Sequence, residues 1–162
     1  MNQDTNEVPY MARTRDYYRA LGYAKDYVWS HYEDVPFTPL PRPLSQMRLA
    51  LVTTSSPTDR SNADERGVRH IWSAPVTPPP AALYTDNLAW DKESTHTRDV
   101  DSFLPIAAAQ AWAGTGRFGS LAPHFHGIST EYSQRKTIEV DAPELLQRLR
   151  DDNAEGAILC PL

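Results

Sequence analysis

The sequence predicts an α/β fold, a three-layer sandwich in which helices cover both faces of a mainly parallel sheet. Residues Met47–Thr54 read M-R-L-A-L-V-T-T, a nearly continuous apolar run that is typical of a strand buried on both faces. A helix that begins near Asp141 leads directly into a second apolar strand, Ala157–Cys160. A strand–helix–strand order implies a crossover and parallel pairing. The alanine-rich stretch Pro105–Trp112 suits a covering helix with proline in its first turn.

Composition excludes several classes of protein. The chain has 162 residues, enough for one domain with its own core, and its formal net charge is −5. A negative charge argues against a nucleic-acid partner, because such proteins usually carry a basic patch. No run approaches the roughly 18 apolar residues that cross a bilayer, and the polar N-terminus is no secretory signal, so no membrane partner and a cytoplasmic location are expected. One cysteine excludes a disulfide framework and a cysteine-rich zinc site.

Residues 1–46 are predicted to form an N-terminal arm, and residues 47–162 the α/β domain. In the arm, Thr14–Leu21 suits a short helix that Gly22 ends. Prolines cluster between Pro36 and Pro43, where they favour an extended surface strap. Aromatic residues are dense here, and they are expected to pack the arm on the domain or on a partner subunit: Tyr17, Tyr18, Tyr23, Tyr27, Trp29 and Tyr32.

Further strands are predicted over Arg69–Val76, Leu83–Trp90 and Arg117–Leu121. The helix at Asp141 carries a capping signal, because Glu144 stands three residues after the aspartate. An apolar stripe on one side of the helix is formed by Leu145, Leu146 and Leu149. On the other side, Glu144 and Arg148 are spaced four apart and are predicted to form an ion pair. Asn153 and Gly156 are predicted to end the helix.

Three stretches carry a resemblance to a known family. They are Leu51–Thr54, the run Thr95–Ile106 with its continuation G-R-F-G-S-L-A-P at 116–123, and Ala157–Leu162. The chain from about Arg48 onward resembles the selenoprotein B family of glycine, betaine, sarcosine and D-proline reductases. The resemblance implies an oxidoreductase subunit that cleaves a carbon–nitrogen bond reductively, with a dithiol as electron donor.

The family pattern has a selenocysteine or cysteine directly after the strand, at the position that would follow Leu162. This chain holds no selenocysteine and no second cysteine. Because UGA encodes selenocysteine and also stops translation, we expect that the chain is truncated at such a codon. Cys160 lies near the expected nucleophile but is not that residue; from the sequence alone it is equally a small buried side chain of the strand.

The candidate site residues fall into two groups. Thr53 and Thr54 follow a strand at its carboxyl end, where ligands bind in open α/β sheets, although such hydroxyls also cap turns. Together with Arg98 and Ser120 they are predicted to bind substrate, Arg98 by clamping a carboxylate unless it pairs with a nearby aspartate. His96, His124 and His126 are the predicted catalytic acid–base groups. An H-x-H pair in an extended segment points both rings to one side.

No cofactor and no metal site are predicted, since the chain has neither a G-x-G-x-x-G motif nor a Walker loop. The resemblance implies a small-molecule substrate and other reductase subunits as partners, pyruvoyl-containing or selenoprotein A-like, and further copies of this chain are another candidate. Two alternatives remain. One is a non-catalytic binding or assembly subunit that docks a partner through the aromatic arm. The other is a metal protein built on His96, His124, His126 and Cys160.

Overall fold

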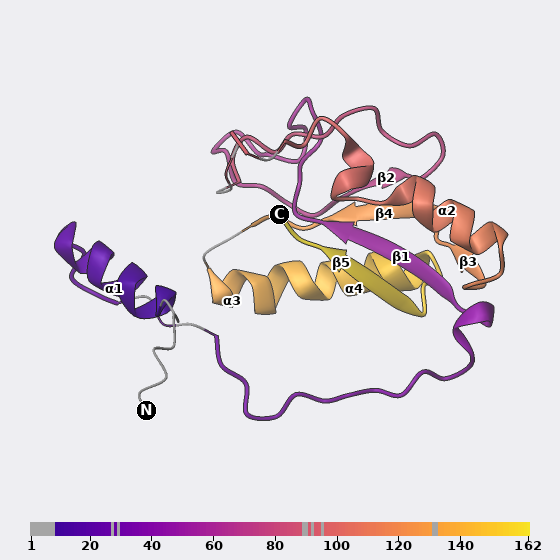
Figure 1. Cartoon of the computed structure of the whole chain (residues 1–162), viewed down its shortest axis with the longest axis horizontal. Helices are drawn as coiled ribbons and strands as arrows, with labels where there is room; N and C mark the ends of the chain where they lie inside the picture. The colour runs from indigo at the N-terminus through magenta and orange to yellow at the C-terminus, as the bar shows by residue number, and fades with distance from the viewer. Residues whose placement is uncertain are drawn as a thin grey trace, which may run out of the picture. The chain divides into compact units, whose positions relative to one another are not determined.

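The structure is a computed structural model, and it describes residues 9–26, 28, 30–88, 91, 93–94, 96–130 and 133–162 (Figure 1). The chain divides into two compact units, residues 1–37 and 38–162. The division falls after Phe37 rather than after residue 46, because the Pro-rich strap is bound to the second unit. Arg42 forms an ion pair with Glu155, and the Leu44 carbonyl accepts a hydrogen bond of 3.1 Å from the Gly119 N–H.

In the first unit, helix α1 spans Tyr10–Ala20, so it begins earlier than predicted, directly after Pro9. Gly22 follows with a positive φ of 87°, which confirms the predicted role of this glycine in ending the helix. Tyr18 makes edge-to-face contacts with Tyr17 and Tyr23. No residue of α1 is buried. Of the predicted aromatic cluster, Tyr27 and Trp29 lie outside the described residues, and the packing of the arm on another surface stays a prediction.

The second unit holds a five-stranded, mainly parallel sheet with helices, which confirms the predicted α/β class. Its elements in chain order are η1 (Leu44–Gln46), β1 (Arg48–Thr53), β2 (Trp72–Pro75), η2 (Val100–Ser102), α2 (Ile106–Gly114), β3 (Ser120–Leu121), β4 (His124–Gly127), α3 (Gln134–Lys136), η3 (Thr137–Asp141), α4 (Ala142–Asp151) and β5 (Gly156–Cys160). No helix among the described residues is long and apolar enough to cross a membrane.

Strand β1 is the centre of the sheet. It pairs in parallel with β5 over its length, from Leu49↔Gly156 to Thr53↔Cys160. It also pairs in parallel with β3 near its start and with β4 near its end. Strand β2 lies antiparallel on the outer side of β4. The parallel relation of β4 and β5 to β1 confirms the crossover predicted for the helix between them.

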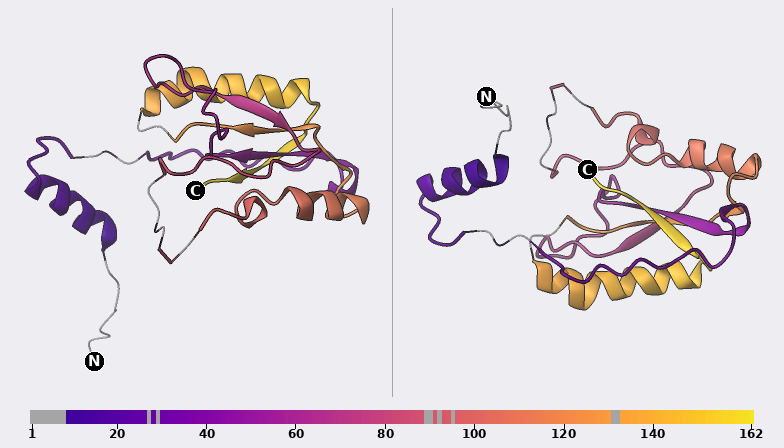
Figure 2. Two further views of the ribbon diagram at one scale, coloured as in Figure 1. Left: turned by 90° about the horizontal axis from the view of Figure 1, so that it is seen from above. Right: turned by 60° about the horizontal axis from the view of Figure 1, so that its bottom comes forward.

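The two faces of the sheet carry separate apolar clusters, which we call the α2 face and the α4 face after the helices that cover them (Figure 2). On the α2 face, Leu49 and Leu51 of β1 pack with Ile106 of α2. On the α4 face, Val52 packs with Leu145 of α4. Alternation along β1 therefore sends neighbouring side chains into different cores, which is why its apolar run is continuous.

Two predicted strands are shorter in the structure, and one is wrong. The segment Arg69–Val76 forms a strand only over β2, and Arg117–Leu121 only over β3. Where described, Leu83–Trp90 forms no strand: Tyr84 makes an isolated bridge to Ser56, and the chain then turns at Thr85. Ala89 and Trp90 lie outside the described residues. Prolines in the preceding segment limit regular pairing, because proline donates no ladder hydrogen bond.

The predicted cap at Asp141 is also wrong. Asp141 has helical dihedral angles and makes no capping hydrogen bond, because the helix already begins at α3 and passes through the wider turn η3. Its buried carboxylate instead accepts hydrogen bonds of 2.8 and 2.9 Å from Lys136 Nζ. The predicted Glu144–Arg148 pair is confirmed at 2.7 Å. Leu146, predicted in the apolar stripe, is 46% exposed, whereas Leu145 is 9% exposed.

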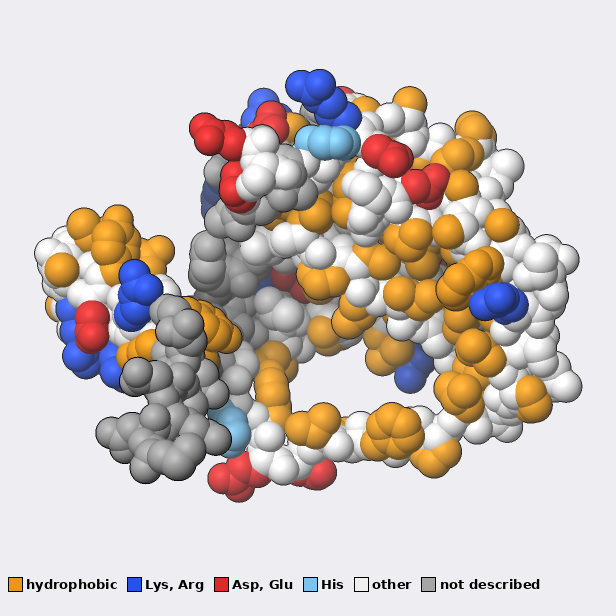
Figure 3. Space-filling view, viewed as in Figure 1, with side chains coloured by type: hydrophobic (Ala, Val, Ile, Leu, Met, Phe, Trp, Pro, Cys, Tyr) orange, Lys and Arg blue, Asp and Glu red, His pale blue; other side chains and the backbone are white. Residues whose placement is uncertain are grey.

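Hydrophobic side chains also remain at the surface. The Pro-rich strap before β1 runs extended and exposed, as predicted, and Figure 3 shows hydrophobic atoms along it. In β5, Ile158 and Leu159 are both exposed, one on each face of the strand. The predicted last strand is therefore present, but its outer residues lack the cover that β1 has.

Candidate functional site

A cluster of buried hydroxyls follows the carboxyl end of β1. Thr53 Oγ1 and Ser55 Oγ lie 3.0 Å apart, and the Ser55 N–H donates to Thr53 Oγ1. Ser56 is also buried, and its hydroxyl lies 3.4 Å from the Asn62 side-chain amide. The three hydroxyls are hydrogen-bonded, as expected for polar side chains that are removed from water, whereas the buried Asn62 Oδ1 has no hydrogen-bond partner. Thr53 thus has a defined structural partner at the position where sequence predicts substrate binding.

The end of β5 reaches the same place. The N–H of Leu162 donates a hydrogen bond of 2.9 Å to Thr54 Oγ1, which ties the last residue of the chain to the hydroxyl turn. Cys160 pairs with Thr53 across the two strands and packs against the α2-face core. Burial raises the pKa of the Cys160 thiol, so the side chain is protonated at neutral pH. A protonated thiol is a weak nucleophile, and the role of Cys160 stays a prediction.

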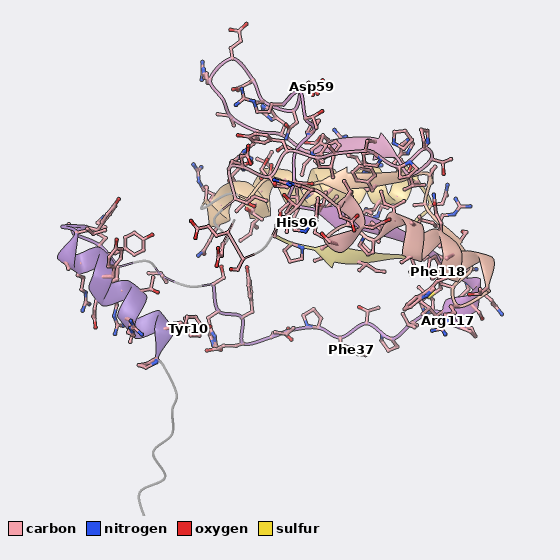
Figure 4. The ribbon with its side chains drawn as sticks, turned by 45° about the horizontal axis from the view of Figure 1, so that its top comes forward. Tyr10, Phe37, Asp59, His96, Arg117 and Phe118 are labelled. Atoms are coloured by element: carbon pink, nitrogen blue, oxygen red, sulfur yellow. The ribbon has the colours of Figure 1, made fainter. Side chains whose placement is uncertain are left out.

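His96 is connected to this turn indirectly, through hydrogen bonds between two loops. Tyr84 exchanges backbone hydrogen bonds of 2.8 and 2.9 Å with Ser56. The next residue, Thr85, is hydrogen-bonded at 2.5 Å to Thr97, the neighbour of His96. His96 and Arg98 are exposed in the loop before η2 (Figure 4). The preceding Thr95, part of the family-like run, lies outside the described residues.

Ser120 lies at the opposite edge of the sheet. It pairs with Arg48 at the start of β1, and Arg48 Nε donates to its hydroxyl at 3.2 Å. The surrounding G-R-F-G-S block is structural: Arg117 stacks on Trp112 and Phe118 is buried in the core, while a Cβ at Gly119 would lie 2.6 Å from the Gln46 carbonyl carbon (Figure 4). The structure does not bring Ser120 together with Thr53 and Thr54.

His124 and His126 lie on β4 with both rings on the α4 face, as an H-x-H pair in a strand requires. Both rings approach Asp152, which follows α4. His124 Nδ1 is 2.9 Å from Asp152 Oδ1, and His126 Nε2 is 3.3 Å from Oδ2. The second contact lacks hydrogen-bond geometry, so the buried Nε2 of His126 has no hydrogen-bond partner. His124 is 46% exposed and His126 2%.

The other nitrogen of His126 contacts Ser73, which is in turn bonded to Arg148, and neither residue was predicted from the sequence to belong to this site. His126 Nδ1 is 2.8 Å from Ser73 Oγ on β2, and Arg148 Nη1 donates to the same hydroxyl at 2.8 Å. Burial is the main reason that the pKa of His126 falls below its ordinary value of 6.5, with Arg148 and His124 acting in the same direction and Asp152 opposing them. His126 is therefore neutral at neutral pH.

Two hollows open on this side of β2. One, of about 310 Å³, is lined by Ser73, both β4 histidines, Arg148, Asp152 and their neighbours. A larger one, of about 480 Å³, lies beside the loop of Asp59 (Figure 4). The acidic groups of that loop are used by the backbone: Asp59 accepts from Ser61 N–H, and Asp64 accepts from the N–H groups of Arg66 and Val68. The larger hollow is also lined by His70, whose Nε2 lies 3.7 Å from Asp64 Oδ2, whereas the smaller one brings two histidines to a serine and a carboxylate.

Within the described part of the chain, no group of three or more histidine, cysteine, aspartate or glutamate side chains is arranged to hold a metal ion. The alternative metal site is not assembled, because His126 faces α4 while Cys160 faces α2. Comparisons of the chain with protein-family models, curated proteins and solved structures found no match.

Proposed function

We propose that the chain is a subunit of a reductase of the selenoprotein B type, which cleaves the carbon–nitrogen bond of an amino acid or betaine-type substrate. The observation that supports this proposal is the meeting of β1 and β5 at the hydroxyl turn. Leu162 is hydrogen-bonded to Thr54, so a residue at the family's nucleophile position would stand beside the Thr53–Thr54 turn, to which the loop of His96 is connected through Tyr84 and Thr85. Ligands of open α/β sheets bind at this edge.

The chemistry requires an anionic nucleophile that this chain does not itself contain. A selenolate or thiolate attacks the α-carbon of the substrate, and the amine departs with the electron pair of the broken bond. A thiolate of a dithiol then attacks the selenium or sulfur of this adduct, and the carbon takes a proton as its bond to the nucleophile breaks. The second thiol closes the disulfide and frees the nucleophile, so the dithiol supplies the two electrons. The partner subunits carry the pyruvoyl group that activates a free amino acid. In this chain the exposed His96 is the group suited to give a proton to the departing amine.

The gene and the native protein test the proposal together. A UGA or cysteine codon after Leu162, followed by an open reading frame, supports it; UAA at that position contradicts it. With a UGA codon, native protein purified from cells grown with radioactive selenite is expected to carry selenium, and with either codon it is expected to exceed the 18.2 kDa of the present chain. A native product of 18.2 kDa without selenium, which releases no amine from glycine, betaine or proline with a dithiol, would overturn the proposal.

A second candidate is a binding or assembly subunit, and the exposed aromatic face of α1 favours it. Tyr10 is 70% exposed and Tyr17 63%, although aromatic side chains of this size usually find a packing surface. If the arm docks a reductase subunit, replacing Tyr10, Tyr17 and Tyr23 by serine is expected to abolish co-purification with that subunit. Unchanged co-purification contradicts the docking role, and circular dichroism of the variant checks that the α/β domain remains folded.

A further inference from the structure

We propose that Ser73 is a second, separate reactive centre, a serine nucleophile for acyl transfer that uses His126 as its general base and hydrolyses small esters. This inference is independent of the reductase proposal, because it uses residues of the α4 face and needs no selenium. It rests on the pairing of β2 with β4, on the buried imidazole, and on the hollow into which Ser73 opens.

The sheet register brings the nucleophile and the base together. In the antiparallel pair of β2 and β4, Ser73 stands directly opposite His126, and both side chains point to the α4 face. Their Oγ–Nδ1 distance of 2.8 Å is within the range of a serine–histidine pair. A guanidinium can only donate, so Ser73 accepts from Arg148, and its own proton is directed to Nδ1 of His126. The neutral imidazole is then protonated at Nε2.

The surroundings of His126 suit a base that becomes transiently charged. Asp152 approaches it from the end of α4, His124 from β4, and Arg148 from α4. When His126 takes a proton, the nearby Asp152 carboxylate stabilises the imidazolium, which is the role of the acid in a serine–histidine–aspartate arrangement. The buried Nε2, which has no hydrogen-bond partner, lies 3.3 Å from the nearest oxygen of that carboxylate.

Ser73 itself is exposed and lines the hollow of about 310 Å³. The remaining walls are short or polar and include Ala74, Pro75 and Asp151, which leaves room for a short acyl group rather than a long chain. Arg148 is placed to stabilise charge on the oxygen of the tetrahedral intermediate, since that oxygen forms on the carbon bonded to Ser73 Oγ. Glu144 holds the guanidinium through bonds of 2.7 and 3.2 Å.

The reaction has two steps, acylation of Ser73 and hydrolysis of the acyl-serine, and its only co-reactant is water. Ser73 Oγ bonds to the ester carbonyl carbon while its proton passes to His126, and the carbonyl electron pair moves to oxygen. When the carbonyl re-forms, the carbon–oxygen bond to the alcohol breaks, and the alcohol takes the proton from His126. Water then attacks the acyl-serine in the same manner and releases the carboxylic acid, which restores the serine.

The test uses the whole chain with p-nitrophenyl acetate as the acyl donor, and with peptide mapping to locate the acetyl group. We expect acetylation of Ser73 at a rate about 100-fold above that of other exposed serines, the lower end of general-base catalysis. Ser73→Ala is expected to abolish the fast release of nitrophenolate, and His126→Gln to slow it by about 100-fold. Ser102→Ala is the matched control, because the Ser102 hydroxyl only donates to the Asp99 carbonyl; it should leave the rate unchanged.

A pH profile keeps the proposal falsifiable if His126→Gln fails to fold. The wild-type acylation rate is expected to fall only below the ordinary histidine value of 6.5, because the base stays neutral to lower pH. The proposal would be overturned by any of three results. These are an acylation rate that does not fall at low pH, acetylation spread over lysines and surface serines, and equal rates in the wild type and Ser73→Ala. Absence of selenium from the native protein would leave it unaffected, so failure of the two proposals is distinguishable.

Discussion

Replacement of Gly127 by alanine is the sharpest test of how the sheet is assembled. Gly127 is the last residue of β4 and stands opposite Trp72 of β2. A Cβ added there would lie 1.7 Å from Trp72 Nε1 and 2.3 Å from Cε2, well inside the roughly 3.5–4.0 Å of carbon contacts. The indole would have to leave its site, since no small shift of a ring removes an overlap of this depth.

The cost follows from what the indole now contacts. Trp72 Nε1 donates to the Ser55 carbonyl at 3.1 Å, and the loss of such a bond costs about 1 kcal/mol. Its edge-to-face contact with Phe125, with ring centres 5.3 Å apart, is worth about 0.5–1.5 kcal/mol. Overpacking of a filled core adds about 1–3 kcal/mol. We therefore expect Gly127→Ala to lower the free energy of unfolding by about 4 kcal/mol, the sum of mid-range values.

Urea unfolding followed by far-ultraviolet circular dichroism measures this loss, and Gly114→Ala is the matched control. A Cβ at Gly114 meets nothing within 4 Å, and the residue has no positive φ. At the end of a helix, alanine in place of glycine is expected to stabilise the protein by up to about 1 kcal/mol. The two substitutions make the same chemical change and should shift stability in opposite directions.

A double-mutant cycle identifies the cause. Trp72→Leu removes the ring that the new methyl group would strike, so Gly127→Ala should cost much less in that background than in the wild type. If Gly127→Ala stays within about 1 kcal/mol of the wild type, the close fit of Trp72 over β4 does not exist in solution. Equal costs in both backgrounds would show that Trp72 is not the obstacle.

Two further predictions concern the α4 face. Leu145→Ala should lower the free energy of unfolding by about 2–3 kcal/mol, because the side chain is buried, whereas the exposed Leu146→Ala should change it by less than about 0.5 kcal/mol; equal losses in urea unfolding would place the wrong leucine in the core. The pKa of His126 is lower in the folded protein than its ordinary value of 6.5, so as pH falls His126 takes up a proton in the unfolded chain before it does in the folded protein. The contribution of neutral His126 to the free energy of unfolding is therefore present above pH 6.5 and decreases below it. Urea midpoints measured across this range should fall less steeply for His126→Gln, and an unchanged slope would show that His126 is not the group responsible.

The sheet core was predictable because local pattern and burial agree there. Strands β1 and β5 carry continuous apolar runs, and the helix between β4 and β5 requires parallel pairing. The start of α4 was not predictable from its own residues, since the acidic signal at Asp141 is also the signature of a cap. Its actual partner, Lys136, belongs to the preceding turns, which begin at Ser133 with a side-chain cap of 3.2 Å.

The α4-face site was only half predictable. The spacing of His124 and His126 indicated that they share a face, but no local signal linked them to Ser73, because antiparallel pairing between distant strands sets that contact. Asp152 was missed for a similar reason: it follows the helix end and reads as a terminal polar residue. The close approach of Trp72 to Gly127 is likewise visible only once the pairing of β2 with β4 is known.

The alternation of side chains across β1 keeps the two proposed sites apart. Paired residues of neighbouring parallel strands point to the same face, so His126 shares the face of Val52, while Cys160 shares the opposite face with Thr53. A substrate held over the hydroxyl turn on the α2 face would therefore not contact His126. Of the three histidines predicted to act in the reductase reaction, His96 is connected to that turn through Thr97, Thr85 and Tyr84, whereas we propose that His126 serves Ser73.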